Sequence, residues 1–434
     1  MANSYHAARA MIILAIVIYA GSSQAENRES ELQKIRIDDR IPYGQQPIDY
    51  HGKAVLDTVT QLDRQLAADE VNLQFRDKHG YLLSLLNALK IPIESQVLVY
   101  SKTAVNQQLI GPKTPRAIYF NLQAYVAWVP KTLELEVAAI DPQKGFVFYV
   151  LSNRKPESDS RPRLERTSRC LACHVGNTTL QIPGLIVRSF QTDRRGKPVS
   201  GYSRVTHATP VKNRWGGWYV TGRHGTQPHL GNLIGEEDND RHKSEPNFNG
   251  NVTDLSDCFD VSLYPTQHSD LVAHLVLNHQ VHGQNLLIRV NHEARLKRRS
   301  DAEEQLIRYL FFVDEAPLAA AVRGTTAFAK RFQRHAVADS QKRSLRQFNL
   351  KSRIFKFRLS YLIYSDLFRK LPLAAKSRIV TRLRNVLRGD NPAPEFKRIP
   401  QSERDEILEI LKSTTDELGV NRLKKKVAKQ ARKP

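Results

Sequence analysis

The chain has 434 residues, of which 41% are hydrophobic and 25% are charged, and its formal net charge is +22. These proportions exclude an intrinsically disordered chain and are typical of a globular protein of two or three domains. The positive charge favours an acidic partner protein or an anionic membrane surface.

Residues 1–25 have the pattern of a secretory signal peptide. Arg9 supplies a positive charge, residues 10–20 form an apolar stretch too short to span a bilayer as a helix, and Ser23 and Ala25 suit a cleavage site. We therefore expect an exported, periplasmic protein that is soluble or peripherally attached to a membrane, which makes nucleic acid a poor partner. An uncleaved membrane anchor is the alternative.

Residues 26–152 are expected to form an N-terminal α+β region. Residues 26–60 are polar and predict an irregular lead-in, and the Leu-rich residues 81–89 predict a short helix that ends before Pro92. A hairpin of two strands around the turn 141–145 is the clearest local prediction. We expect a small, mostly antiparallel sheet, with strands at 96–101, 117–120, 124–129, 133–140 and 146–151.

Residues 153–251 are expected to hold a charged linker and a haem-binding segment. Cys170, Cys173 and His174 spell C-x-x-C-H, the attachment motif of c-type haem. Two thiols three residues apart can add to the two vinyl groups of one porphyrin, and the next residue then supplies the proximal imidazole. The thiol spacing also occurs in redox disulfides and half zinc sites, but the adjacent histidine and the lack of a second cysteine pair argue against both. We expect one haem c, bound covalently at Cys170 and Cys173, with His174 as the proximal iron ligand.

The other axial ligand of the iron is not methionine in the mature chain. Both methionines, Met1 and Met11, lie in the expected signal peptide. The remaining choices are a second histidine, another side chain, or an open face that binds small molecules.

Histidines on a predicted helix at 269–296 are the best distal candidates. His279 and His282 fall on an otherwise apolar helical face, and we predict His279 as the distal haem ligand. A structural role in the core is the competing interpretation, and His224 and His229 are alternative ligands. A metal site made by His279 and His282 themselves lacks a third ligand.

Residues near the motif suggest further contacts with haem. Arg163, Arg166 or Arg169 could pair with the propionates, and the carbonyl of Pro183 could accept the second N–H of His174. In the glycine-rich segment 214–225, Trp215, Trp218 and Tyr219 predict either packing on a porphyrin edge or an ordinary aromatic strand.

The rest of the chain predicts a helical region at 252–420 and a basic tail at 421–434, which either solvates the chain or aids attachment to an anionic surface. Residues 236–251 predict a surface loop, and Cys258, left without a partner, predicts a small buried side chain. Ser269 and Asp270, Ser300 and Ser402 suit helix caps. Helices are predicted at 269–296, 302–312, 375–387 and 402–411.

The motif resembles that of c-type cytochromes. More widely, residues 96–232 resemble a group of large exported bacterial cytochrome-c-domain proteins of unassigned function. The shared marks are FVFYVL at 146–151, CLACH at 170–174, Pro183 with Gly184, RWGGWYVTGRHG at 214–225, NHQ at 278–280 and SYLIY at 360–364. The resemblance implies haem binding and an electron-transfer or redox role, and it carries over only Cys170, Cys173 and His174.

Single-electron transfer by an exported monohaem cytochrome is the leading expectation for function, with no catalytic residue assigned. The alternatives are a haem enzyme with an open distal face, either peroxidase-like or a reductase of a small oxidant, and a haem-based sensor. Binding of CO or NO by the resting protein would favour the alternatives.

Overall fold

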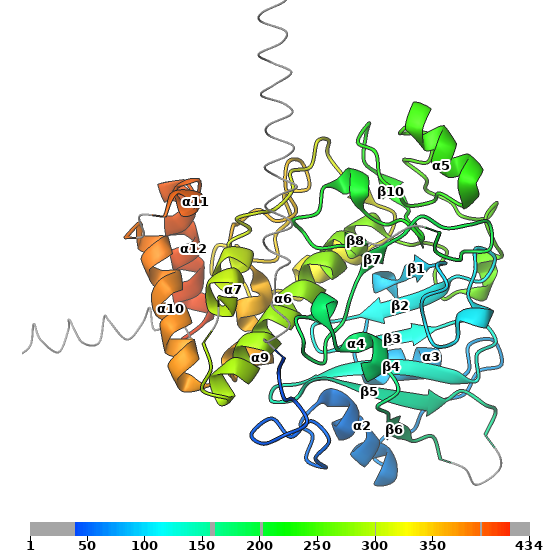
Figure 1. The fold of residues 1–434 in the computed structure, drawn as a ribbon, viewed down its shortest axis with the longest axis horizontal. Coiled ribbons are helices and arrows are strands. Elements are labelled where there is room, and N and C mark those ends of the chain that lie inside the picture. The colour runs from blue at the N-terminus through cyan, green and yellow to red at the C-terminus, as the bar shows by residue number, and fades with distance from the viewer. Residues whose placement is uncertain (1–39, 157–160, 200–202, 300, 391–392, 417–434) are drawn as a thin grey trace, which may run out of the picture. The chain divides into compact units, whose positions relative to one another are not determined.

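Seven strands form one antiparallel sheet at the centre of the N-terminal half (Figure 1). The computed structural model describes residues 40–156, 161–199, 203–299, 301–390 and 393–416. The order across the sheet is β6-β5-β4-β3-β2-β1-β9, and two small two-stranded ribbons pair β7 with β8 and β10 with β11. The strands are β1 (Val97–Val99), β2 (Arg116–Phe120), β3 (Ala124–Trp128), β4 (Glu134–Asp141), β5 (Gly145–Ser152), β6 (Leu164–Arg166), β7 (Arg188–Ser189), β8 (Ser203–Arg204), β9 (Trp218–Tyr219), β10 (Gly222–Arg223) and β11 (Arg323–Gly324).

The predicted hairpin is confirmed as β4 paired with β5. The carboxylate of Asp141 accepts hydrogen bonds from the backbone N–H groups of Gln143, at 2.7 Å, and Lys144, at 2.8 Å. Gly145 has a φ of +85°, a conformation that favours glycine. The turn therefore fixes the register of the two longest strands.

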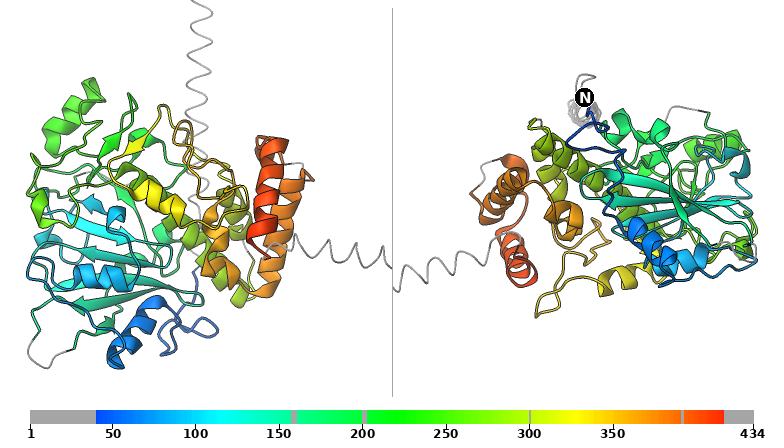
Figure 2. Two further views of the ribbon diagram at one scale, coloured as in Figure 1. Left: turned by 180° about the vertical axis from the view of Figure 1, so that it is seen from behind. Right: turned by 90° about the horizontal axis from the view of Figure 1, so that it is seen from below.

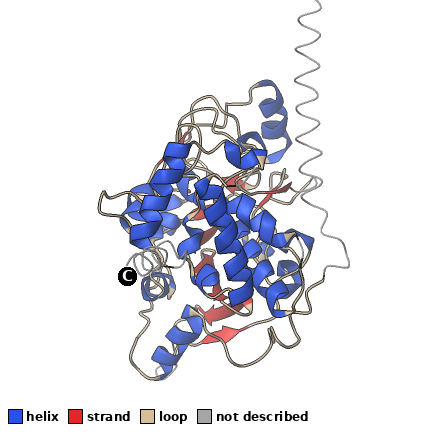
Figure 3. Cartoon of the chain, turned by 90° about the vertical axis from the view of Figure 1, so that its left-hand side faces the viewer, coloured by secondary structure: helices blue, strands red, loops and turns tan. Residues whose placement is uncertain are grey.

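The described helices gather mainly in the C-terminal half, which confirms the α+β class. They are α2 (Thr58–Ala67), α3 (Leu82–Ala88), α4 (Leu171–His174), α5 (Gly235–Ser244), α6 (Leu271–Arg295), α7 (Ala302–Leu310), α8 (Phe328–Arg334), α9 (Asp366–Arg369), α10 (Leu373–Arg388), α11 (Pro394–Lys397) and α12 (Gln401–Thr414). Seen from the helical side, many helices lie in front of the sheet (Figure 3).

Helix α6 joins the sheet to the C-terminal helices. Asp270 caps it by accepting from the N–H groups of Val272, at 2.8 Å, and Ala273, at 3.0 Å. On one side Gln284 bonds to Tyr125 of β3, and on the other α6 packs against α7, α8, α9 and α10. Nearly all of α6 is therefore buried, although it is 25 residues long.

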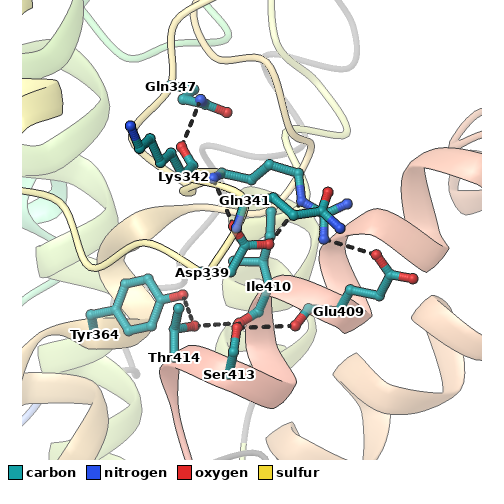
Figure 4. Close-up of polar contacts among 10 residues, drawn as sticks. Asp339, Gln341, Lys342, Gln347, Tyr364, Glu409, Ile410, Ser413 and Thr414 are labelled. Atoms are coloured by element: carbon teal, nitrogen blue, oxygen red, sulfur yellow. Dashed lines mark hydrogen bonds and ion pairs between the residues drawn. The ribbon is translucent and has the colours of Figure 1, made fainter.

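Helices α10 and α12 pack against each other beyond α7 (Figure 2). A polar network ties α12 to the loops before it: Tyr364 shares a hydrogen bond of 2.7 Å with Thr414, and Glu409 accepts one of 2.8 Å from Arg343 (Figure 4). These contacts hold the end of the described chain against the segment that contains Tyr364.

Opposite faces of the central sheet have different neighbours. Tyr119, Val126 and Tyr149 belong to the apolar core that includes residues of α2 and α3. Their chain neighbours Ile118, Tyr125 and Phe148 line a pocket on the other face. The alternation of side chains along each strand thus separates the structural core from the candidate site.

Three local predictions are wrong. Helix α2 begins at Thr58, inside the predicted lead-in, and helix α5 replaces most of the predicted loop at 236–251. Acidic residues in the first turn of α5 and basic residues in its last turn favour this exposed helix through its dipole. Ser402 lies inside α12, whose N-cap is Pro400.

Strands β6 and β9 bring parts of 153–251 into the sheet formed by the region before it. Residues from Pro42 onward form one compact unit. The expected signal peptide, the basic tail and Ser300 lie outside the described residues. Among the residues with described structure, no helix is long and apolar enough to cross a membrane.

Glu315 gives a pH-dependent contribution to stability. Burial raises the pKa of its carboxyl to about 7, against the opposing effects of the Ile354 N–H, which donates to it at 2.8 Å, and of Arg353, Arg214 and Arg358. Between the ordinary pKa of 4.5 and about 7, the folded state holds a proton that the unfolded state has lost. The contribution of Glu315 to the free energy of unfolding therefore falls as the pH rises from 4.5 to about 7, by on the order of 3 kcal/mol.

The variant Glu315→Gln keeps an acceptor for Ile354 and cannot ionise. We expect it to match the wild type near pH 4.5 and to become the more stable protein as the pH passes 7. Urea unfolding of both proteins at several pH values measures this difference, and parallel stability curves would contradict it.

Candidate functional site

The C-x-x-C-H residues form a single turn of helix. The backbone N–H groups of Cys173, at 3.1 Å, and His174, at 3.0 Å, both bond to the carbonyl of Cys170. The turn places both thiols and the imidazole on the lining of one pocket. Burial raises the pKa of the Cys170 thiol to about 11, whereas the thiols of redox-active C-x-x-C motifs have depressed pKa values.

The imidazole of His174 has the tautomer of a metal ligand. Its Nδ1 lies 2.8 Å from the carbonyl oxygen of Gly184, and because a carbonyl only accepts, Nδ1 carries the proton. Nε2 is then the unprotonated nitrogen, and it has no hydrogen-bond partner among the described residues. Burial lowers the pKa of His174 to about 4, so the ring is neutral near pH 7. A hydrogen bond from the second nitrogen is the usual means of orienting a ligating histidine.

The prediction of Pro183 as the acceptor is wrong by one residue. The carbonyl of Pro183 accepts instead from the N–H of Phe146, at 3.2 Å. Helix α6 holds the segment in place, because Asn285 accepts from the N–H of Leu185, at 3.2 Å, and donates to its carbonyl, at 2.7 Å. A Cβ on Gly184 would lie 2.7 Å from the side-chain oxygen of Asn285, so this close approach requires glycine.

The pocket beside the motif is mainly apolar. Its cavity volume is about 150 Å³, and the unfilled space that includes its open mouth is about 920 Å³. The walls come from β2 to β5, β9, α4, α6 and the segments at 103–105 and 185–187. The apolar lining residues are Ala104, Val105, Ile118, Ala127, Val137, Ala138, Phe148, Leu185, Ile186, Val187, Trp218, Leu277 and Val281.

Two arginines line this pocket. Arg169 pairs with Glu134 at 3.1 Å, and Arg116 pairs with Glu136, which also lines the pocket. Arg169 was named from the sequence, whereas Arg116 was missed. The one sequence feature that could have indicated Arg116 is its place as a lone arginine at the start of an apolar strand.

The other two arginines suggested from the sequence lie elsewhere. Arg163 bonds to Asp63, and Arg166 bonds to the carbonyl of Gly52 at 2.9 Å. Arg116 and Arg169 are therefore the arginines on the lining of the pocket, each paired with a glutamate.

The structure does not bring His279 to the pocket. Leu277 and Val281, four residues apart on α6, line the pocket, whereas position 279 lies on the far side of the helix. His279 is buried and bonds to His207, at 2.8 Å, and to Ser360, at 2.7 Å. Both of its ring nitrogens are therefore engaged in a separate cluster.

The alternative distal histidines also lie outside the pocket. His229 accepts from the N–H of Gly231 at 2.9 Å, and His224 accepts from the N–H of Asn251 at 2.8 Å. Within the described ranges, His174 is the only histidine on the lining of the pocket, and no group of three potential ligands suitable for a metal ion is present.

The two tryptophans of this segment occupy different places, and Trp215 lies on no strand. Trp218 lies on a strand of the sheet and lines the pocket. Trp215 is buried outside it and donates to Asn278 at 3.0 Å. Cys258 is half-buried against the apolar core, and burial raises its pKa, as expected for an unreactive thiol.

The residues present fit a c-type haem: two thiols, a neutral imidazole with a free Nε2, an apolar wall and two arginines share one pocket. Comparison with protein-family models gives no match, and comparisons with curated proteins and with solved structures give none either.

Proposed function

We propose that this chain is an exported monohaem protein in which Cys170 and Cys173 hold haem c covalently and His174 is the proximal iron ligand. The observation that carries the proposal is the His174 imidazole, whose Nδ1 is bonded to Gly184 while its Nε2 remains free beside the two thiols. When bound, haem supplies one-electron redox chemistry and a position for a small ligand.

The pocket residues have separate roles in this proposal. Arg116 and Arg169 bind the propionates, and the apolar walls exclude water. Tyr125 is held in one orientation because its hydroxyl donates to Gln284, at 2.6 Å, and accepts from Gln280, at 2.7 Å. These residues bind and orient the cofactor, and the proposal assigns no proton transfer to them.

Binding of a small molecule, in a small-oxidant enzyme or a sensor, is the favoured use of this site. The support is the lining of the pocket, where the described residues offer no second histidine. Electron transfer with an acidic partner protein or at an anionic membrane surface is the second candidate. It is favoured by the open mouth of the pocket, the exposed Cys173 and the net charge of +22.

Binding of CO separates the two candidates. We expect the reduced protein to bind one CO per haem, with a changed absorption spectrum, because the described residues place no histidine other than His174 in the pocket to compete with CO. The variant His279→Gln should bind CO equally well. A reduced protein with sharp low-spin bands that ignores CO would instead favour the electron carrier.

A further inference from the structure

A second cavity, of about 510 Å³, lies between the end of α3, the turn joining β2 to β3, and the segments around α8 and α9. Its volume is in the range of pockets that hold small organic ligands. The pocket that contains Cys170 is a different cavity on the same sheet.

Positive charge predominates on the wall of this cavity. Lys90, Arg331, Arg346 and Arg369 line it, opposed by the single carboxylate of Asp366. Arg369 pairs with Asp366, and Arg331 lies 3.5 Å from Glu94. Lys90 and Arg346 have no ion-pair partner in the part of the chain that the structure describes.

Arg346 is the more informative of these two cations. Its guanidinium stacks over Phe332, at 4.9 Å, and Tyr361, at 5.3 Å, and makes one long hydrogen bond of 3.4 Å to the carbonyl of His335. Burial lowers its pKa. Its side chain is half-buried against two rings and has no carboxylate partner among the described residues, so an anionic ligand could form a charge-assisted hydrogen bond with it.

Aromatic side chains form another part of the wall. Phe120, Phe328, Phe332 and Tyr364 all line the cavity, with the rings of Phe120 and Phe328 5.8 Å apart. Tyr364 is itself fixed by Thr414 of α12 (Figure 4). A wall with aromatic faces and unpaired cations suits a ligand with a flat apolar body and an acidic group.

We propose that this cavity is a binding site for a small aromatic carboxylate, with Arg346 and Lys90 holding the acidic group. The basic tail is a poor occupant, since residues 421–434 hold seven basic and no acidic side chains. The site also adjoins the haem pocket: Gln280 lines the cavity and donates to the hydroxyl of Tyr125, which lines the other pocket. Binding requires only residues of this cavity, so its test does not depend on the proposed haem.

Isothermal titration of the purified full chain with naphthoate tests the site. We expect the wild type to bind one naphthoate per chain. The wild type should bind neutral naphthalenemethanol at least about tenfold more weakly than naphthoate, and the variant Arg346→Gln should bind naphthoate at least about tenfold more weakly than the wild type does. In both cases a charge-assisted hydrogen bond is lost. The variant Lys330→Gln is the matched control: it removes an exposed charge from the same helix as Arg331, outside the cavity, and should bind as the wild type does.

Should Arg346→Gln fail to fold, as judged by circular dichroism, Lys90→Gln replaces it, because Lys90 is exposed and should be dispensable for folding. The variant Lys90→Gln should bind naphthoate severalfold more weakly than the wild type does. Absence of binding heat, equal affinity for the neutral alcohol, or undiminished binding by the folded variants would overturn the proposal.

Discussion

The double variant Cys170→Ser with Cys173→Ser is expected to carry no covalent haem. Both thiols lie on one turn at the edge of the pocket, and each supplies one thioether in the proposed attachment. A hydroxyl does not replace a thiol in this bond. Each single variant should retain one thioether and show the altered absorption of a haem with one free vinyl group. Haem staining of denaturing gels and the pyridine haemochrome spectrum measure these outcomes.

Cys258→Ser is the matched control for the cysteine variants. Its thiol lies against the apolar core and outside the pocket, so this variant should carry as much covalent haem as the wild type. Covalent haem that survives the double substitution, or that disappears with Cys258, would move the attachment away from the motif.

Replacement of His174 by glycine has the second large expected effect. No other described histidine lies on the pocket, so the variant loses its axial nitrogen and the wild-type spectrum with it. Loss of outer-shell partners alone reduces metal affinity by about 10–100-fold, and loss of the ligand should cost at least as much. Added imidazole should enter the vacated space and restore much of the wild-type spectrum.

The controls for His174→Gly are His279→Gln and His229→Gln. Both histidines are buried in other clusters, and circular dichroism first establishes that the variants fold. Their spectra should match that of the wild type. A spectrum lost with His279 and retained without His174 would reverse the assignment of the ligands.

The sequence predicted the fold best where a local pattern was strong. The hairpin of β4 and β5 follows from apolar runs around a turn, and α6 follows from helical periodicity after Asp270. Helix α5 was missed because it has almost no apolar face, so its charged ends are the only signal. The pairing of β1 with β9 joins residues far apart in the chain, and no local pattern predicts it.

In the candidate site, too, the sequence predicted what depends on neighbouring residues and failed where the packing of distant segments decides. The spacing of Cys170, Cys173 and His174 placed these side chains together because the residues are neighbours in sequence, and all three line one pocket. The distal prediction rested on the apolar face that His279 shares with its helix, but α6 is buried on nearly every side. Periodicity therefore could not tell which of its faces meets the pocket, and Leu277 and Val281 turn out to do so.

The most direct test of the central claim is the absorption spectrum of the wild-type protein in the pyridine haemochrome assay, with the intact mass measured on the same sample. The protein should be exported by cells competent in cytochrome c maturation. We predict a c-type spectrum and a mass that exceeds that of the processed chain by one haem. A chain without haem, or one that releases all its haem on denaturation, would contradict covalent attachment at Cys170 and Cys173.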